Sequence, residues 1–168
     1  MKDLVAYLRV VDNPRDELSL RRILDVPPRG VGEGSLAKDE ALRIRKGLTL
    51  ERALREASFG DEIPERGRRG LQQLFHTIDD ARRALQDKQS IVRTTERLYS
   101  QSGFEGMLAG DTSVQGQRRR ENVSFLLRSL QRFEEAQRGI SLGQFLTRLM
   151  LRAEQEEEDA RNVVTLSS

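Results

Sequence analysis

Apolar residues recur at intervals of three and four along most of the chain, which is the period of an amphipathic α-helix. The clearest run predicts a long helix from about residue 64 to residue 86, with Leu71, Leu74, Phe75, Ile78, Ala81 and Leu85 on one face. The same spacing predicts shorter helices near residues 2–11, 14–24, 35–46, 50–57, 91–101, 118–138 and 142–150. We therefore expect an all-α, irregular multi-helix domain.

Residues that favour helix ends support this division. Thr49, Ser90 and Ser141 each stand just before an apolar run, where a side-chain oxygen can accept a hydrogen bond from a free helix N–H. Gly47 follows a predicted helix and suits the left-handed conformation that often ends one. Residues 110–116 are polar and glycine-rich, which predicts a loop.

The last seven residues depart from the helical pattern. The sequence Asn-Val-Val-Thr-Leu-Ser-Ser at 162–168 is rich in β-branched and apolar residues and predicts a short C-terminal strand. A single strand needs a neighbour to form a sheet, and the chain offers no second strand signal.

The stretch from Val26 to Leu36 joins a proline-stiffened turn to a Gly-apolar-Gly loop and a new helix. Glycines allow positive φ and close approach of a ligand to the backbone, and a helix N-terminus attracts anions. A helix-hairpin-helix-like turn of this kind contacts the phosphates of duplex DNA without reading its bases. The predicted phosphate-binding residues are Arg29, Gly30, Val31, Gly32, Gly34, Ser35 and Lys38. From the residues alone, a plain interhelical turn remains an equal alternative.

Two further basic groups could extend such a surface. They comprise Arg66, Arg68 and Arg69 in the long predicted helix, and Arg118 and Arg119 near the start of a later one. Solvated helix faces explain both groups as well. Because neither group has interleaved aromatic residues, base stacking is not indicated.

Composition narrows the functional classes. The 168 residues are 36% hydrophobic and 33% charged, with a formal net charge of +2 and no cysteine, so no disulfide framework or thiolate metal site is expected. No phosphate-loop motif, zinc motif or nucleophile beside a histidine is present, and we predict no catalytic or metal-binding residues. His76 is interpreted as a surface or boundary residue, and the acidic run 154–159 as a solvated helix end. Without an apolar run of membrane-spanning length, we expect a cytoplasmic protein with no membrane partner.

Several separate motifs together resemble the UvrD/Rep/PcrA family of superfamily 1 DNA helicases. The resemblance covers essentially the whole chain, in order and spacing. Its motifs are Lys2–Arg9, Asn13–Glu17, Val26–Gly32, Ser102–Phe104, Arg119–Asn122 and Asn162–Leu166. The extra Gly34 departs from the family pattern, and residues 110–116 do not match it.

The resemblance implies three parts: residues 1–26 and 161–168 as the two flanking ends of RecA-like domain 2A, and residues 27–160 as helical subdomain 2B. It implies a regulatory subdomain of an ATP-dependent 3′-to-5′ DNA helicase of repair or replication that binds the duplex backbone. The ATP and Mg²⁺ site would lie in the intact parent, so this fragment itself is not expected to be an enzyme or to hold a cofactor. Implied partners are duplex DNA or a single-strand/duplex junction, the motor domains, and accessory repair or transcription proteins near the bacterial nucleoid.

A second function remains open. The chain could be a helical protein-interaction module that regulates the helicase through motor-domain or accessory-protein contacts without binding DNA. This hypothesis predicts exposed apolar surface on the N-terminal helix at Leu4, Tyr7, Leu8 and Val11.

Overall fold

The computed structural model describes the backbone of residues 2–167, and the side chains in that range except those of residues 35, 37–39, 41, 42, 166 and 167. The described residues form nine α-helices and no sheet, which confirms the all-α prediction. The helices are α1 (Lys2–Asp12), α2 (Glu17–Ile23), α3 (Glu33–Lys46), α4 (Leu50–Ala57), α5 (Glu65–Gln86), α6 (Ile91–Gln101), α7 (Phe104–Ala109), α8 (Val114–Ala136) and α9 (Leu142–Ser167).

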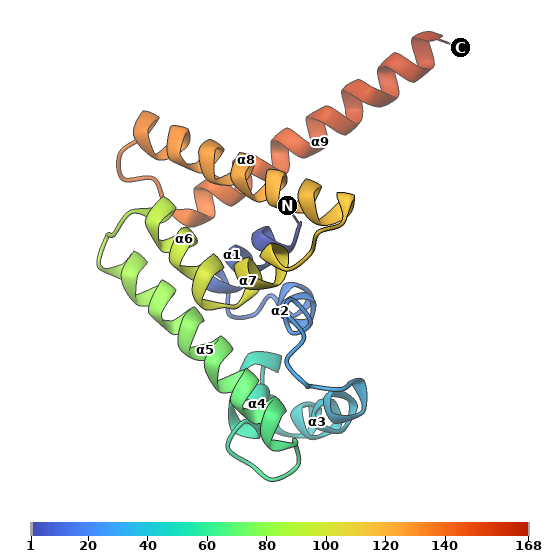
Figure 1. The fold of residues 1–168 in the computed structure, drawn as a ribbon, viewed down its shortest axis with the longest axis vertical. Helices are drawn as coiled ribbons and strands as arrows, with labels where there is room; N and C mark the ends of the chain where they lie inside the picture. The colour runs from blue at the N-terminus through green and yellow to red at the C-terminus, as the bar shows by residue number, and fades with distance from the viewer. Residues whose placement is uncertain (1, 168) are drawn as a thin grey trace.

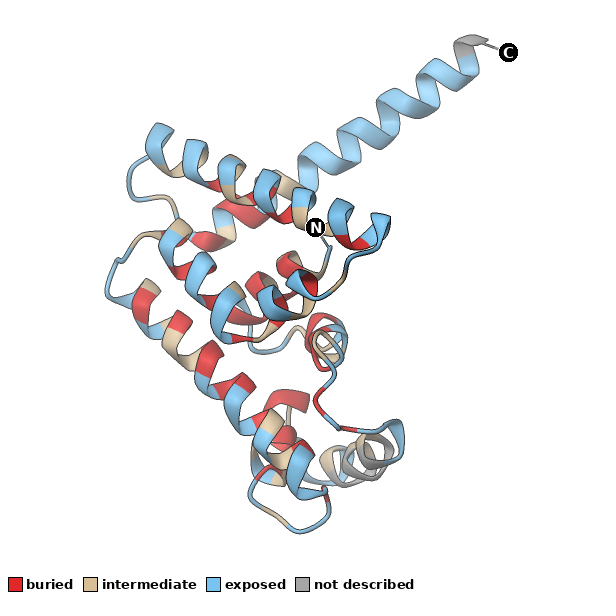
Figure 2. Ribbon diagram, in the orientation of Figure 1, coloured by how far each residue is buried: buried red, intermediate tan, exposed pale blue. Residues whose placement is uncertain are grey.

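Helix α1 lies at the centre of the fold. It packs against α2, α5, α6 and α9, and the inward faces of these helices carry the buried residues (Figures 1 and 2). Leu4, Tyr7, Leu8 and Val11 have exposed fractions between 0% and 6%. The exposed apolar surface expected on this helix by the protein-interaction hypothesis is therefore absent, because neighbouring helices cover it.

The predicted capping residues are confirmed at four helix ends. Thr49 accepts a hydrogen bond from the N–H of Arg52, and Ser90 and Ser141 make the equivalent bonds at the starts of α6 and α9. Gly47 ends α3 with φ +65°. Local sequence is therefore enough to define these ends.

The predicted C-terminal strand is wrong. Helix α9 continues through residues 162–167, and its outer half projects away from the other helices (Figure 1). Residues 150–165 are all exposed (Figure 2). A helix satisfies its backbone hydrogen bonds within one segment, whereas a strand needs a neighbour, and the described residues supply none.

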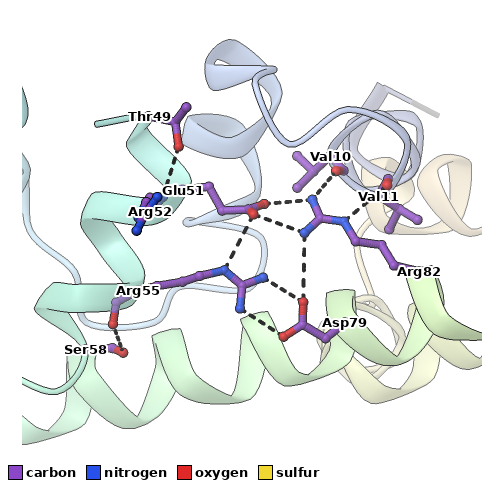
Figure 3. Close-up of polar contacts among 9 residues, drawn as sticks. All are labelled: Val10, Val11, Thr49, Glu51, Arg52, Arg55, Ser58, Asp79 and Arg82. Atoms are coloured by element: carbon purple, nitrogen blue, oxygen red, sulfur yellow. Dashed lines mark hydrogen bonds and ion pairs between the residues drawn. The ribbon is translucent and has the colours of Figure 1, made fainter. Parts of the chain in front are cut away.

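A polar network fastens the C-terminal end of α1 to α4 and α5 (Figure 3). Arg82 of α5 donates to the carbonyl oxygens of Val10 at 2.7 Å and Val11 at 3.2 Å. These carbonyls belong to the last turn of α1, which has no helical partner for them. The same guanidinium holds both carboxylate oxygens of Glu51 in α4, at 2.7 Å and 3.0 Å.

A second arginine extends this network (Figure 3). Arg55 makes a bidentate pair with Asp79 at 2.7 Å and 2.9 Å, and its Nε lies 3.5 Å from Glu51. Hydrogen bonds from Arg55 hold the pKa of the Asp79 carboxyl below its ordinary value. The network therefore connects three helices that the sequence pattern presents only as separate amphipathic segments.

Candidate nucleic-acid interface

The turn at residues 30–34 presents an open helix N-terminus. Gly30 has φ +78°, a conformation that favours glycine, and Gly32 is the N-cap of α3 without any side-chain cap. Atoms placed as a Cβ on Gly32 or Gly34 would meet nothing within 4 Å. Val31 is 8% exposed and anchors the turn in the core. The first N–H groups of α3 therefore have room beside them for a ligand.

Helix α3 starts earlier than the sequence suggests. The predicted start is near Ser35, whereas the structure begins the helix at Glu33. The carboxylate of Glu33 lies in the first turn and interacts favourably with the positive end of the helix dipole. It therefore also competes with an approaching phosphate for that positive end. The predicted contacts through the side chains of Ser35 and Lys38 lie outside the described side chains.

The turn crosses α5 at two glycines that sequence analysis did not select. A Cβ on Gly67 would lie 2.9 Å from the carbonyl oxygen of Gly30, and one on Gly70 would lie 2.8 Å from that of Arg29. Only glycine allows the two backbones to approach this closely. The sequence does contain a sign of this crossing, namely two glycines three residues apart inside a strongly amphipathic helix. Each glycine costs about 1 kcal/mol of helix stability relative to alanine, so its presence indicates that close packing requires it.

Arg29 requires a correction to the sequence interpretation. Its side chain is only 6% exposed, and its Nη2 donates to the hydroxyl of Tyr7 and, at 3.3 Å, to the carbonyl oxygen of Ser102. A guanidinium occupied in this way inside the protein does not face a phosphate at the surface. Its partners come from α1 and from the end of α6, which are distant in the sequence, and this explains why sequence position alone does not reveal the burial.

Of the three candidate arginines near the start of α5, only Arg66 combines exposure with closeness to the turn. Its side-chain carbons would lie 3.3 Å from a Cβ on Gly30, and no described side chain forms an ion pair with it. Arg69 is exposed and pairs with Glu65 at 2.6 Å. Arg68 is half-buried and donates to the carbonyl oxygen of Gly60 at 3.1 Å.

The arginines at the start of α8 also differ in their surroundings. Arg119 binds Asp3 of α1 at 2.8 Å and lies over the ring of Phe104 at 5.8 Å. Burial raises the pKa of Asp3, but hydrogen bonds from Arg22 and Arg119 outweigh burial and leave that pKa below its ordinary value. Arg119 therefore connects helices, whereas Arg118 is exposed.

Comparison with known families identifies the class of protein to which this all-α fold belongs as the UvrD-like helicases. The UvrD-like helicase C-terminal domain matches residues 1–168, and the chain belongs to that family. The family predicted from the sequence motifs is thereby confirmed.

Individual relatives are ATP-dependent DNA helicases named PcrA. The chain is 32% identical over 173 residues to PcrA of Bacillus subtilis strain 168, an alignment that covers 99% of this chain and 23% of that protein. It is 31% identical over 168 residues to PcrA of Staphylococcus aureus strain NCTC 8325, again with 99% and 23% coverage. The chain thus spans about a quarter of the length of the curated relatives it matches.

The described residues also show neither a membrane-spanning helix nor a cluster of metal ligands. None of the described helices combines the length and apolar character needed to cross a membrane. Among the described side chains, no three histidine or acidic residues gather as a metal site would require. His76 is largely exposed and lies 3.3 Å from Asp80, in agreement with its interpretation as a surface residue.

Proposed function

We propose that this chain is a regulatory subdomain, of the 2B type, that binds the backbone of duplex DNA for an ATP-dependent 3′-to-5′ helicase. The observation that carries the proposal is the exposed N-terminus of α3 behind the Gly30 turn, with Arg66 beside it. Free N–H groups, a positive helix end and one exposed guanidinium together suit a phosphate. The family and its PcrA relatives, named as DNA helicases, make a DNA phosphate the preferred ligand.

The proposal assigns the remaining roles as follows. ATP, Mg²⁺ and the strand-separating chemistry belong to parts of the parent helicase outside these residues. The partners are duplex DNA or a single-strand/duplex junction, the motor domains, and accessory proteins. The location is the bacterial cytoplasm, at the nucleoid. In this proposal residues 27–160 form the helical subdomain, and residues 1–26 and 161–168 are the flanking ends of domain 2A. DNA-stimulated ATPase activity of the purified chain would contradict the non-enzymatic role.

Salt-titrated fluorescence anisotropy with a short duplex tests the interface. Wild-type binding should fall in the nonspecific range, about 10⁻⁴ to 10⁻⁶ M, and weaken steeply with salt. Gly32→Asp should lower affinity about tenfold or more, because it places a carboxylate where the phosphate would lie. Gly32 suits this change because it has open space and negative φ, whereas substitution of Gly30 would be strained.

Matched controls separate the site from general charge effects. Ser141→Asp makes the same charge change at an exposed N-cap of another helix and should leave affinity unchanged within about twofold. Arg66→Gln should reduce the slope of log affinity against log salt by about 1. Arg138→Gln, at an exposed arginine in the turn between α8 and α9, should change that slope less. Equal affinity for Gly32→Asp, Arg66→Gln and wild type at every salt concentration would remove the turn from the interface.

One observation favours the protein-interaction alternative. Leu18 on α2 and Ile44 on α3 are 82% and 71% exposed, and the pair Glu17–Arg43 at 2.7 Å joins their two helices. Under this alternative, Leu18→Glu and Ile44→Glu would abolish binding to the isolated motor domains while duplex affinity of the chain stayed at zero. Under the DNA-binding proposal, both variants keep wild-type duplex affinity.

A further inference from the structure

A buried polar cluster lies directly beneath the DNA-facing turn. Tyr7 of α1 is fully buried, donates its hydroxyl proton to the carbonyl oxygen of Val26, and accepts a hydrogen bond from Arg29. Arg29 also donates to the carbonyl oxygens of Ser102 at 3.3 Å and Val26 at 3.5 Å. We call Tyr7, Arg29 and these two carbonyls the Tyr7–Arg29 hub.

The hub holds a buried cation without an acidic partner. No carboxylate among the described residues lies within ion-pair distance of Arg29, and its Nε has no hydrogen-bond partner there. Burying such a charge is costly unless fixed dipoles compensate it. Here the compensation comes from the phenol oxygen and two carbonyls, one of which belongs to Ser102, the C-cap of α6 and the negative end of that helix. Burial raises the pKa of the Tyr7 phenol, which keeps the hydroxyl protonated as a donor.

The hub fixes both ends of the segment that precedes the Gly30 turn. Val26 is held through its carbonyl oxygen and Arg29 through its side chain, so the backbone between them is fixed from below. Pro27 lies against the corner between α6 and α7, since a Cβ on Gly103 would be 3.2 Å from the Cγ of Pro27. From the side, the carbonyl of Arg29 rests on α5 at Gly70.

The hub also brings together residues from separate sequence motifs. Tyr7, Arg29 and Ser102 come from three of the motifs that mark the helicase resemblance, and they meet at one point inside the fold. Phe104 of the third motif stacks on Tyr7 with ring centroids 6.1 Å apart, and Arg119 of a fourth lies over Phe104. Tyr7 and Phe104 support the turn from inside the fold, since both are almost fully buried.

We propose that Arg29 is a positioning residue: together with Tyr7 it holds the backbone of Gly30–Gly32 in the conformation that accepts a DNA phosphate, and it does not contact the phosphate itself. This inference rests on the proposed function. A binding loop ordered in advance loses less entropy when its ligand arrives, so loosening the hub lowers affinity without removing any contact to DNA.

Tyr7→Phe is the decisive variant, because Tyr7 is fully buried and cannot contact DNA. The change keeps the aromatic ring and removes only the hydroxyl that both Val26 and Arg29 use. We expect ¹⁵N order parameters to fall at Gly30 and Gly32 but not at Gly139, a turn glycine on the α8–α9 connection. Duplex affinity, measured where circular dichroism shows a fully folded chain, should fall about threefold to tenfold.

Arg29 variants complete the test. Arg29→Met should weaken duplex binding at least as much as Tyr7→Phe, and Arg29→Lys should recover part of the loss because an ammonium can still donate to the same oxygens. Tyr7→Phe combined with Arg29→Met should bind no more weakly than Arg29→Met alone, because both act through one unit. Arg66→Gln combined with Arg29→Met should multiply the two losses.

The outcomes separate this inference from the proposed function. If Tyr7→Phe and Arg29→Met keep wild-type order parameters and affinity while Arg66→Gln weakens binding, the hub has no positioning role and the interface stands. If wild type fails to bind duplex at low salt, the proposed function fails, and the role of the hub in DNA binding fails with it. Unchanged order parameters at Gly30 and Gly32 in Tyr7→Phe would in addition reject the structural part of the inference, that the hub holds the turn. Multiplicative losses in the Tyr7→Phe and Arg29→Met double variant would overturn the single-unit account.

Discussion

Replacing Arg82 by methionine should destabilise the fold more than any exposed arginine substitution. The side chains of Arg82 and Glu51 are only 19% and 10% exposed, and the guanidinium also covers two carbonyls of α1. Removing one member of a buried pair costs about 3–5 kcal/mol, because the other charge loses its compensation. Glu51 retains Arg55 at 3.5 Å, so we expect the lower end of that range, about 3 kcal/mol.

Urea unfolding followed by far-ultraviolet circular dichroism measures this loss. A loss of about 3 kcal/mol is a large share of the roughly 5–15 kcal/mol typical of a domain, yet it leaves the chain folded in water. The slope of unfolding free energy against urea should stay at its wild-type value, since the surface exposed on unfolding is unchanged.

Arg83→Met is the matched control, one residue along the same helix. The Arg83 side chain is 66% exposed and its acidic neighbour Asp80 lies 3.6 Å away, so its loss should cost less than about 1 kcal/mol. Adding Glu51→Gln to Arg82→Met should cost less than the sum of the single changes by about 1–3 kcal/mol. Equal unfolding free energies for Arg82→Met and Arg83→Met would show that the contacts of Arg82 with α1 and Glu51 do not stabilise the fold.

Three further predictions use other described contacts. Gly67→Ala should lower the unfolding free energy by about 1–3 kcal/mol, since its Cβ would lie 2.9 Å from the carbonyl oxygen of the crossing turn; Gly106→Ala, with open space around it, should raise thermal stability slightly. Hydrogen bonds from Arg55 hold the pKa of the Asp79 carboxyl in the folded chain below its ordinary value of 3.8, so the stabilisation that it provides is full above that pH and is lost as the pH falls through the folded-state pKa. The difference in unfolding free energy between wild type and Asp79→Asn should therefore shrink as the pH is lowered from about 7 to about 3. Glu134→Gln should cost about 1 kcal/mol in a thermal melt, because its carboxylate accepts hydrogen bonds from two N–H groups at the start of α6; the exposed neighbour Glu135→Gln is its control. An equal effect of the two glutamate changes, a pH-independent difference for Asp79→Asn, or a stable Gly67→Ala would contradict the respective contact.

The sequence predicts features that depend on local chemistry. The caps at Thr49, Ser90 and Ser141 are side-chain bonds to a backbone three residues away, and short-range spacing is enough to identify them. The all-α class and the helicase family follow from periodicity and motifs in the same way. Of the candidate site, sequence identifies the Gly30–Gly32 turn, and its binding of DNA stays a prediction.

Features that depend on distant neighbours are less accessible to sequence analysis. The burial of Arg29 depends on Tyr7 and on the end of α6, which lie 22 and 73 positions away in the chain. The β-branched residues near Val163 carry a strand propensity that has no partner strand among the described residues. In both places the tertiary surroundings decide the outcome.

The crossing of the Gly30 turn over α5 also limits how the turn can move. The carbonyl oxygens of Gly30 and Arg29 lie against α5 at Gly67 and Gly70, so sliding along the helix would move each carbonyl from a glycine toward a position that carries a side chain. Small displacements of the turn relative to α5 are therefore blocked on both sides. The turn and α5 therefore form one unit, and the direction of α5 reports the direction in which the turn points.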